Sequence, residues 1–268
     1  MQILLFEKFD NAALPPNTSW PGSFTFGKDD WVIVENSANG AYGGSGKSLK
    51  ATYPAISGDQ AAYPWSGFDL TPYNTDHVYI RFRAKMPGAK HGFKFVKVFG
   101  QRDAPVGYAN TTFGLDYTGV DLGGMYCVSY GDGSDTESDT ASILGFDGLG
   151  YPGRAEGLPG FSVTRPQGKI FGSADWGTGW HVFELYVKFN SGTTRANEKN
   201  DGEIFVRIDG KTYLDAKGIF NRHPQNGKLD RIEILGWTQT PRGAAVPSFE
   251  IWYDNIEISL NGWGNSPI

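Results

Sequence analysis

Charged and aromatic side chains alternate with apolar ones along residues 180–189. The decorated positions are Val182, Glu184, Tyr186 and Lys188, and the apolar ones are Phe183, Leu185, Val187 and Phe189. Successive side chains of a β-strand point to opposite faces, so this pattern predicts a strand with one packed and one decorated face. Aromatic rings stack on pyranose faces and charges orient hydroxyl or uronate groups, so such a face suits a sugar polymer. The alternative is an outer sheet face that is only solvated.

Residues 77–86 show the same alternation. The apolar row is Val78, Ile80, Phe82, Ala84 and Met86, and the other row is Tyr79, Arg81, Arg83 and Lys85. Side chains two apart on a strand share a face, so Arg81 and Arg83 are expected on one face at a spacing of about 7 Å.

The elements that carry these rows are predicted to be β-strands throughout. The chain has 268 residues with 37 glycines and 15 prolines, and no long stretch has the apolar spacing of a helix. About a dozen short strands predict an all-β, two-sheet antiparallel jelly-roll sandwich, one domain over 1–268, with long loops at its rim at 131–179. The predicted core positions come from four strand segments: Phe183, Leu185, Val187, Ile204, Val206, Ile208, Ile232 and Ile234.

Charge and composition restrict the partners. The net charge of −5, without basic runs, argues against nucleic acid and against anionic membrane surfaces. The single cysteine, Cys127, excludes an intramolecular disulfide. The first ten residues show no signal-peptide pattern. We therefore expect a location on a virion surface after release by lysis, or secretion if a leader has been removed.

Several strand segments together resemble a known superfamily. They are HVYIRFRAKM followed by GFKFVKVFG, then W-H-x-F-E-x-Y-V-K-x-N, then N-D-G-x-x-x-V-x-I-D-G-K, and the closing EIWYDNIEIS. These motifs, within 77–100 and 180–259, resemble the concanavalin A-like lectin/glucanase jelly rolls, and most of all their polysaccharide-lyase-type members. The resemblance implies a concave sheet that forms a groove for an extended glycan. The superfamily includes enzymes, lectins and virion modules, so the fold alone does not fix the function.

The resemblance also implies site residues. Its lyases remove a proton α to a uronate carboxyl and expel the 4-linked sugar, with the carboxylate neutralised by a cation or amide and the proton carried by Tyr, His or Lys. The implied glycan-binding residues are Arg81, Arg83, Lys94, Lys97, Tyr117, Tyr126, Tyr186, Lys188 and Arg207. In a lyase, Tyr186 would transfer the proton and Arg83 would hold the carboxylate. None of the four histidines lies centrally on a strand row beside a tyrosine, so a catalytic His/Tyr pair is not visible.

Carboxylates give two further expectations. Retaining hydrolysis needs two carboxyl groups about 5 Å apart, and Glu184 has no acidic partner two or four residues on, which argues against a glucanase. The acidic run at 132–139 lacks the spacing of an EF-hand loop, so we interpret it as solvated. No cofactor is required, but the resemblance implies a structural Ca²⁺ that clamps the terminal strands through Glu7 or Asp10 near the start and Asp254 near the end.

Three interpretations of function remain open. The favoured one is a glycan-binding or surface-decorating module, such as a bacteriophage protein for head decoration or adhesion, with a surface glycan and other virion proteins as partners. The second is an endo-acting polysaccharide lyase that cleaves a uronate polymer by β-elimination. The third is a purely structural jelly roll. The absence of a visible catalytic pair and of a leader favours the first.

Overall fold

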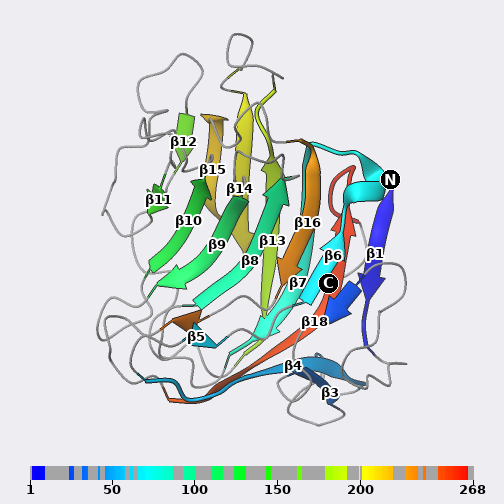
Figure 1. The fold of residues 1–268 in the computed structure, drawn as a ribbon, viewed down its shortest axis with the longest axis vertical. Coiled ribbons are helices and arrows are strands. Elements are labelled where there is room, and N and C mark those ends of the chain that lie inside the picture. Colours follow the sequence, from blue (N-terminus) through cyan, green and yellow to red (C-terminus); the bar gives the residue numbers. More distant parts are fainter. Residues whose placement is uncertain are drawn as a thin grey trace.

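The described part of the protein forms two antiparallel β-sheets, each with nine strands (Figure 1). The computed structural model describes residues 2–9, 24–26, 32–35, 42, 46–57, 61–62, 66–86, 93–100, 110–116, 124–130, 143–145, 162–164, 179–191, 199, 201–219, 227–234, 238–239 and 247–264. The helical element in these ranges is one 3₁₀ turn, η2 (Thr71–Tyr73). The predicted all-β sandwich is therefore confirmed. No helix of the described part is long and apolar enough to cross a membrane.

Sheet A contains the chain's last long strand and most of its decorated rows. Its order is β12 (Ser162–Thr164), β15 (Lys211–Ile219), β14 (Gly202–Ile208), β13 (His181–Lys188), β7 (His77–Lys85), β18 (Phe249–Ser259), β4 (Ser48–Tyr53) and β3 (Val32–Glu35). The first strand, β1 (Ile3–Glu7), also pairs with β18.

Sheet B is built largely from the middle of the chain. Its order is β11 (Ile143–Gly145), β10 (Gly124–Tyr130), β9 (Asn110–Asp116), β8 (Phe93–Gly100), β16 (Leu229–Ile234), β6 (Ser66–Asp69) and β2 (Phe24–Phe26). Two short strands, β5 (Ala61–Ala62) and β17 (Thr238–Gln239), pair with each other, and β17 also pairs with β8.

The core lies between the two sheets and is filled by the apolar rows. All eight predicted core positions are at most 4% exposed, which confirms the alternation in their strands. The buried residues of both sheets belong to one hydrophobic cluster, with the ring of Phe82 stacked on that of Phe183 at 5.1 Å between centroids. A single domain over 1–268 stays a prediction, because most of 131–179 lies outside the described residues.

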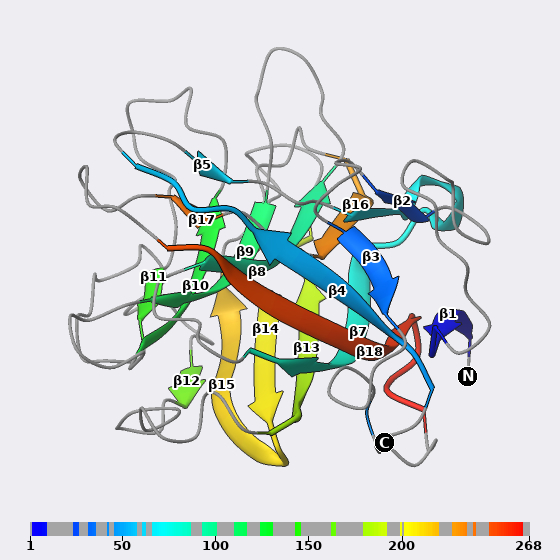
Figure 2. The same ribbon diagram turned by 90° about the horizontal axis from the view of Figure 1, so that it is seen from below.

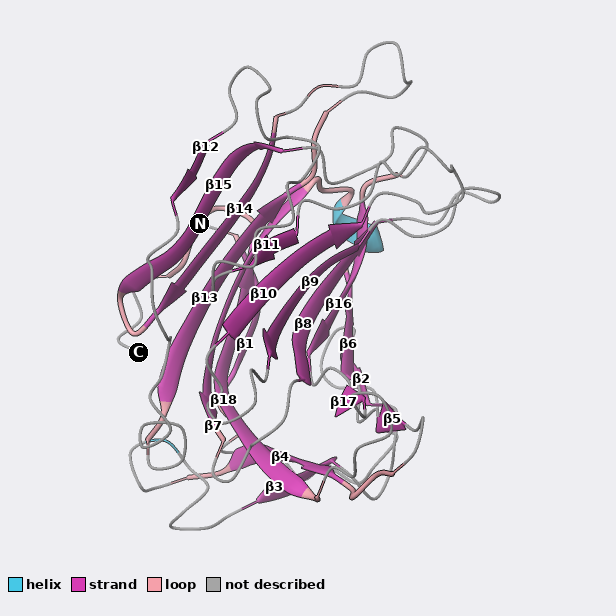
Figure 3. Ribbon diagram, turned by 90° about the vertical axis from the view of Figure 1, so that its left-hand side faces the viewer, coloured by secondary structure: helices cyan, strands magenta, loops and turns pink. Residues whose placement is uncertain are grey.

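The curvature of sheet A decides which of its faces is hollow. Figures 2 and 3 show β18, β4 and β3 bending round the lower end of the sandwich toward β17 and β5 of sheet B. Because sheet A curves toward sheet B, the outer face of sheet A bulges outward. The backbone of sheet A is therefore convex on the face that carries this row, whereas the family resemblance implies a concave sheet there.

Candidate functional site

Five of the predicted site residues share the outer face of sheet A: Arg81, Arg83, Tyr186, Lys188 and Arg207. Their positions alternate with buried core residues on β7, β13 and β14. The register places Glu184 opposite both Arg81 and Arg207, and Tyr186 opposite Tyr79. The prediction that these five positions face the same way is confirmed.

Three cations of this face are paired with carboxylates of the same face. Arg81 Nη2 donates to Glu257 Oε2 at 2.6 Å, with both side chains almost fully buried. The Nε and Nη2 edge of Arg207 holds the Glu184 carboxylate in a bidentate pair. Lys188 Nζ donates to Glu203 Oε1 at 3.0 Å. A carboxylate from outside would have to displace these internal partners, and the buried Arg81–Glu257 pair would be the costliest to break.

The segment after β18 covers the centre of the same face. Gly264 O accepts a hydrogen bond from Arg81 Nη2 at 2.9 Å. The Trp263 ring meets the Tyr79 ring edge-on at 5.2 Å, and the guanidinium carbon of Arg207 lies 5.2 Å from the Trp263 ring centroid. The sequence did not predict that Trp263 and Gly264 cover this face, because a short polar segment has no periodic pattern.

Tyr186 stacks on Tyr79 at 4.4 Å between ring centroids. Burial raises the pKa of Tyr186 well above its ordinary value, and the nearby Glu203 carboxylate raises it further. A tyrosine accepts a proton only as the phenolate, so this shift disfavours Tyr186 as a base at neutral pH.

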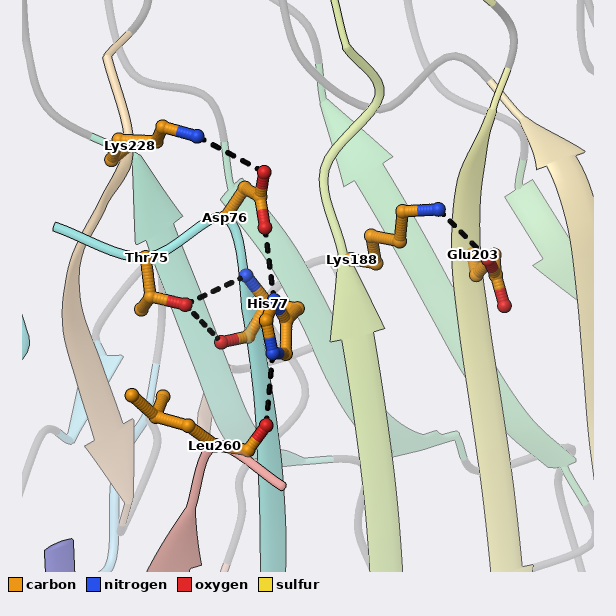
Figure 4. A network of polar contacts seen from close by, with 7 residues as sticks. All are labelled: Thr75, Asp76, His77, Lys188, Glu203, Lys228 and Leu260. Carbon is orange, nitrogen blue, oxygen red and sulfur yellow. Dashed lines mark hydrogen bonds and ion pairs between the residues drawn. The ribbon is translucent and has the colours of Figure 1, made fainter. Parts of the chain in front are cut away.

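A polar network fixes the upper end of β7 (Figure 4). His77 Nδ1 lies 2.9 Å from Asp76 Oδ1, and His77 Nε2 lies 2.9 Å from the carbonyl oxygen of Leu260. Lys228 Nζ donates to Asp76 Oδ2 at 3.0 Å. Burial acts to raise the pKa of Asp76, but the hydrogen bonds from His77 and Lys228 outweigh it and lower that pKa. The network ties β7 to the segment that covers its face.

The residues named for calcium are only partly described. β1 lies beside β18, but the Glu7 side chain and Asp10 lie outside the described residues. Asp254 Oδ2 accepts from the Tyr42 backbone N–H at 3.1 Å, and Asp254 is opposite Arg83 in the register. A carboxylate that faces a guanidinium and accepts backbone hydrogen bonds is not an open calcium ligand. No group of three metal-ligating side chains occurs in the described part, and the calcium site stays a prediction.

A second cluster lies on the outer face of sheet B. Val96 and Val98 are buried in the core, so Lys97 between them faces outward, opposite Glu233 of β16. Arg231 Nε lies 3.3 Å from Glu233 Oε1, and the Arg231 guanidinium carbon is 4.4 Å from the Phe99 ring centroid. We call Lys97, Phe99, Arg231 and Glu233 the sheet B cluster.

The sheet B cluster contains a perturbed lysine. Burial lowers the pKa of Lys97; the Glu233 carboxylate opposes this shift, and the Arg231 charge adds to it. One carboxylate thus stands between two cations on this face. Perturbed titratable groups of this kind are more frequent at functional sites than elsewhere.

Three predicted site residues remain: Lys94, Tyr117 and Tyr126. The register puts position 126 of β10 on the same side of sheet B as Lys97 and Thr112. The side chains of Tyr126 and Lys94 lie outside the described part, as does Tyr117 entirely. Sequence reasoning missed Arg231 and Glu233, although their alternation with Ile232 and Ile234 places them on one outward row.

Comparison with known proteins identifies the fold. No protein-family model and no curated protein sequence matches the chain. Solved structures do match. An endo-β-1,4-glucuronan lyase from the fungus Trichoderma reesei has 11% identity and a TM-score of 0.60, with 96% of this chain and 95% of that chain covered. The alginate lyase Aly36B has 14% identity and a TM-score of 0.59, with 97% and 98% covered.

A third match extends the same group. The alginate lyase vAL-1 from a Chlorella virus has 15% identity and a TM-score of 0.55, with 86% of this chain and 93% of that chain covered. Each alignment spans nearly the whole of both chains, so the likeness concerns the complete sandwich. The chain therefore has the concanavalin A-like jelly-roll fold that these polysaccharide lyases share.

Proposed function

We propose that the protein binds an acidic polysaccharide across the outer face of sheet B, at the sheet B cluster. The observation that carries this proposal is the juxtaposition of Lys97 and Arg231, both near the Phe99 ring, with Glu233 as the acidic partner. The four residues of the sheet B cluster contain two cations and one carboxylate, and a uronate could complement this charge. An aromatic ring nearby supplies an apolar contact for a sugar face.

Two findings support this proposal. The cations Arg81, Lys188 and Arg207 already hold internal carboxylates, and Trp263 covers part of their face. In addition, the solved structures with the same fold include lyases of glucuronan and alginate, which are uronate polymers.

A second candidate function is β-elimination at the same cluster, and the lowered pKa of Lys97 favours it. In this reaction a base removes the proton α to the uronate carboxyl, and the electron pair forms a carbon–carbon double bond. The 4-linked oxygen leaves with its sugar and takes up a proton from water to become a hydroxyl. A lysine with a depressed pKa has a larger neutral fraction and accepts a proton more readily. Arg231 would stabilise the charge that develops on the carboxylate.

One experiment separates these functions. The protein is incubated with alginate, glucuronan and polygalacturonate, binding is measured by calorimetry, and the unsaturated product is followed by its ultraviolet absorbance. Binding without absorbance supports the binding module, and growing absorbance supports the lyase. Loss of either signal in Lys97→Met but not in Lys188→Met, its counterpart on sheet A, places the site on sheet B. The absence of both signals in the wild type would contradict both functions and leave a structural role.

We also propose, on sequence grounds, that the protein is placed on a bacteriophage virion as a decorating or adhesion module, with other virion proteins as partners. The alternative location is the extracellular medium after secretion. The test is to detect the protein in purified virions and then to treat intact virions with protease. Digestion of the protein in intact virions would support a surface location, and digestion only after the virions are disrupted would contradict it.

A further inference from the structure

His77 faces two acceptor oxygens, one at each nitrogen of its ring (Figure 4). Its Nδ1 lies 2.9 Å from Asp76 Oδ1, and its Nε2 lies 2.9 Å from the carbonyl oxygen of Leu260. A carbonyl oxygen accepts hydrogen bonds and donates none, and the same holds for an ionised carboxylate. Both contacts are therefore hydrogen bonds only when both ring nitrogens carry a proton, which is the charged form of the imidazole.

Asp76 competes with Leu260 for the single proton of a neutral imidazole. Burial acts to raise the pKa of Asp76, but the hydrogen bonds from His77 and Lys228 lower it, which keeps the carboxylate ionised. A hydrogen bond to a charged acceptor is stronger than one to a neutral acceptor, so the one ring proton stays with Asp76. The lone pair of Nε2 then faces the Leu260 carbonyl oxygen, and that contact is lost.

Leu260 begins a short segment that lies over the outer face of sheet A. We call this segment, residues 260–264, the strap. The Trp263 ring of the strap lies 5.2 Å from the Tyr79 ring and 5.6 Å from the Phe205 ring, measured between centroids. The strap therefore covers aromatic rings of β7 and β14, and its contact with His77 lies at its first residue.

The other end of the strap is fixed by a buried ion pair. Gly264 O accepts a hydrogen bond from Arg81 Nη2 at 2.9 Å, and the Gly264 N–H donates to Glu257 Oε1 at 2.5 Å. The side chains of Arg81 and Glu257 are at most 7% exposed. Guanidinium and carboxylate groups do not ordinarily gain or lose a proton near neutral pH, whereas an imidazole does. The strap thus has one end whose hydrogen bond depends on a proton.

The groups around His77 leave its own protonation as the step that changes near neutral pH. The strap contains no titratable side chain. Acids ordinarily titrate below this range, and tyrosines and lysines above it. The described titratable groups that face His77, directly or through a paired neighbour, are Asp76, Tyr79, Tyr186, Lys188, Glu203 and Lys228.

We propose that the strap is a pH-sensitive latch, which the protonated His77 ring holds closed and the neutral ring loosens. The stabilisation of the strap is present while the imidazole is charged and is lost as pH rises through the neutral range. Loosening of the strap uncovers the Tyr79 and Phe205 rings on the outer face of sheet A. This latch does not depend on the function proposed for the sheet B cluster.

The test is amide hydrogen exchange of the full chain, measured by NMR from about pH 5.5 to 8 and corrected for the intrinsic pH dependence of exchange. The Gly264 N–H is the reporter, because its hydrogen bond to Glu257 breaks when the strap lifts. Loss of the His77–Leu260 hydrogen bond should lower its protection about fivefold as pH rises. The Leu185 N–H, in the middle of β13, is the reference and should change by less than about twofold.

Two variants at the latch and one matched control sharpen the test. His77→Gln cannot change its charge, so Gly264 protection should vary by less than about twofold over the same pH range. Asp76→Asn removes the charged competitor, so the neutral imidazole can donate to Leu260 and the pH dependence should again stay below about twofold. His181→Gln removes another histidine that contacts a carboxylate, Asp209, at the opposite end of β13, and should leave the fivefold change intact.

Two results would overturn the proposal. One is a wild-type Gly264 protection that changes by less than about twofold, and the other is an unaltered pH dependence in a folded His77→Gln or Asp76→Asn variant. A change at Leu185 as large as that at Gly264 would also contradict it, because the whole sheet would then open and not the strap. Lys97→Met should reduce polymer binding and leave Gly264 exchange unchanged, so failure of the latch is distinguished from failure of the sheet B site.

Discussion

The outer faces of the two sheets carry similar residue types but use them differently. On sheet A, Arg81, Lys188 and Arg207 each have a carboxylate of the same face within hydrogen-bonding distance. Within the sheet B cluster, Lys97 lies opposite Glu233 in the register, and Arg231 Nε lies 3.3 Å from Glu233 Oε1. The two faces therefore differ in how their cations are matched by acids of the same face.

The difference originates in strand order. β7 lies between β13 and β18, and both neighbours present an acid opposite Arg81, namely Glu184 and Glu257. β8 lies between β9 and β16, and the register sets Thr112 on one side of Lys97 and Glu233 on the other. The same alternation thus gives Arg81 an acid on both neighbouring strands and Lys97 an acid on one of its two neighbouring strands.

The largest expected effect tests the sheet A pairing. Glu257→Gln leaves the Arg81 guanidinium buried beside a neutral amide, and should reduce the free energy of unfolding by about 3–5 kcal/mol. Glu233→Gln should cost less, because the side chain of its partner Arg231 is 40% exposed and can turn to water. Urea unfolding of both variants measures the difference. Equal losses would remove the contrast between a buried and an open ion pair.

A smaller effect is expected for ligand binding on sheet B. Lys97→Met should weaken binding to an acidic polymer by about tenfold or more, since it removes one of two cations that face the ligand. Stability should stay unchanged or rise, because burial disfavours the charged form of Lys97. Calorimetry and urea unfolding provide the two measurements. A folded Lys97→Met variant with wild-type polymer affinity would contradict the proposed site.

The two lysines should also give pH dependences of opposite sign. The hydrogen bond to Glu203 raises the pKa of Lys188 above 10.5, so its contribution to stability is present below that pH and is lost as pH rises through the folded-state pKa. Burial lowers the pKa of Lys97 below 10.5, so the unfolding free energy rises as pH rises through that folded-state pKa. The unfolding free energy of each variant is measured across the alkaline pH range. Lys188→Met should lack the part of the wild-type curve that falls with pH, and Lys97→Met should lack the part that rises. Slopes of the same sign would show that one pKa shift is assigned in the wrong direction.

The sequence predicts which side chains share a face, but not which strands are neighbours. Alternation alone places Leu185 and Val206 in the core and Tyr186 on the outer face with Arg83, and the structure confirms both. The acid that neutralises Arg81 is 176 residues away in the chain, so no local pattern reveals it. Side chains alternate with a period of two residues in both sheets. This pattern therefore could not show that Lys97 lies on a different sheet from Arg81, Arg83 and Tyr186. The cover formed by Trp263 depends on a tertiary contact and has no sequence signal.

The smallest effect is expected at Tyr186, which resemblance to the lyases makes a candidate for proton transfer. Its ring packs on Tyr79 on the outer face of sheet A, and burial keeps the phenol protonated. Tyr186→Phe retains the ring stacking and removes only the hydroxyl, so polymer binding and any turnover should change by less than about twofold. Steady-state absorbance and calorimetry on the folded variant check this, with Tyr79→Phe as the control on the adjacent strand. A rate loss of about a hundredfold in Tyr186→Phe alone would return the proton-transfer step to sheet A, with Arg83 as the carboxylate clamp. Lys97 would then be a residue whose lowered pKa reflects burial and has no role in the chemistry.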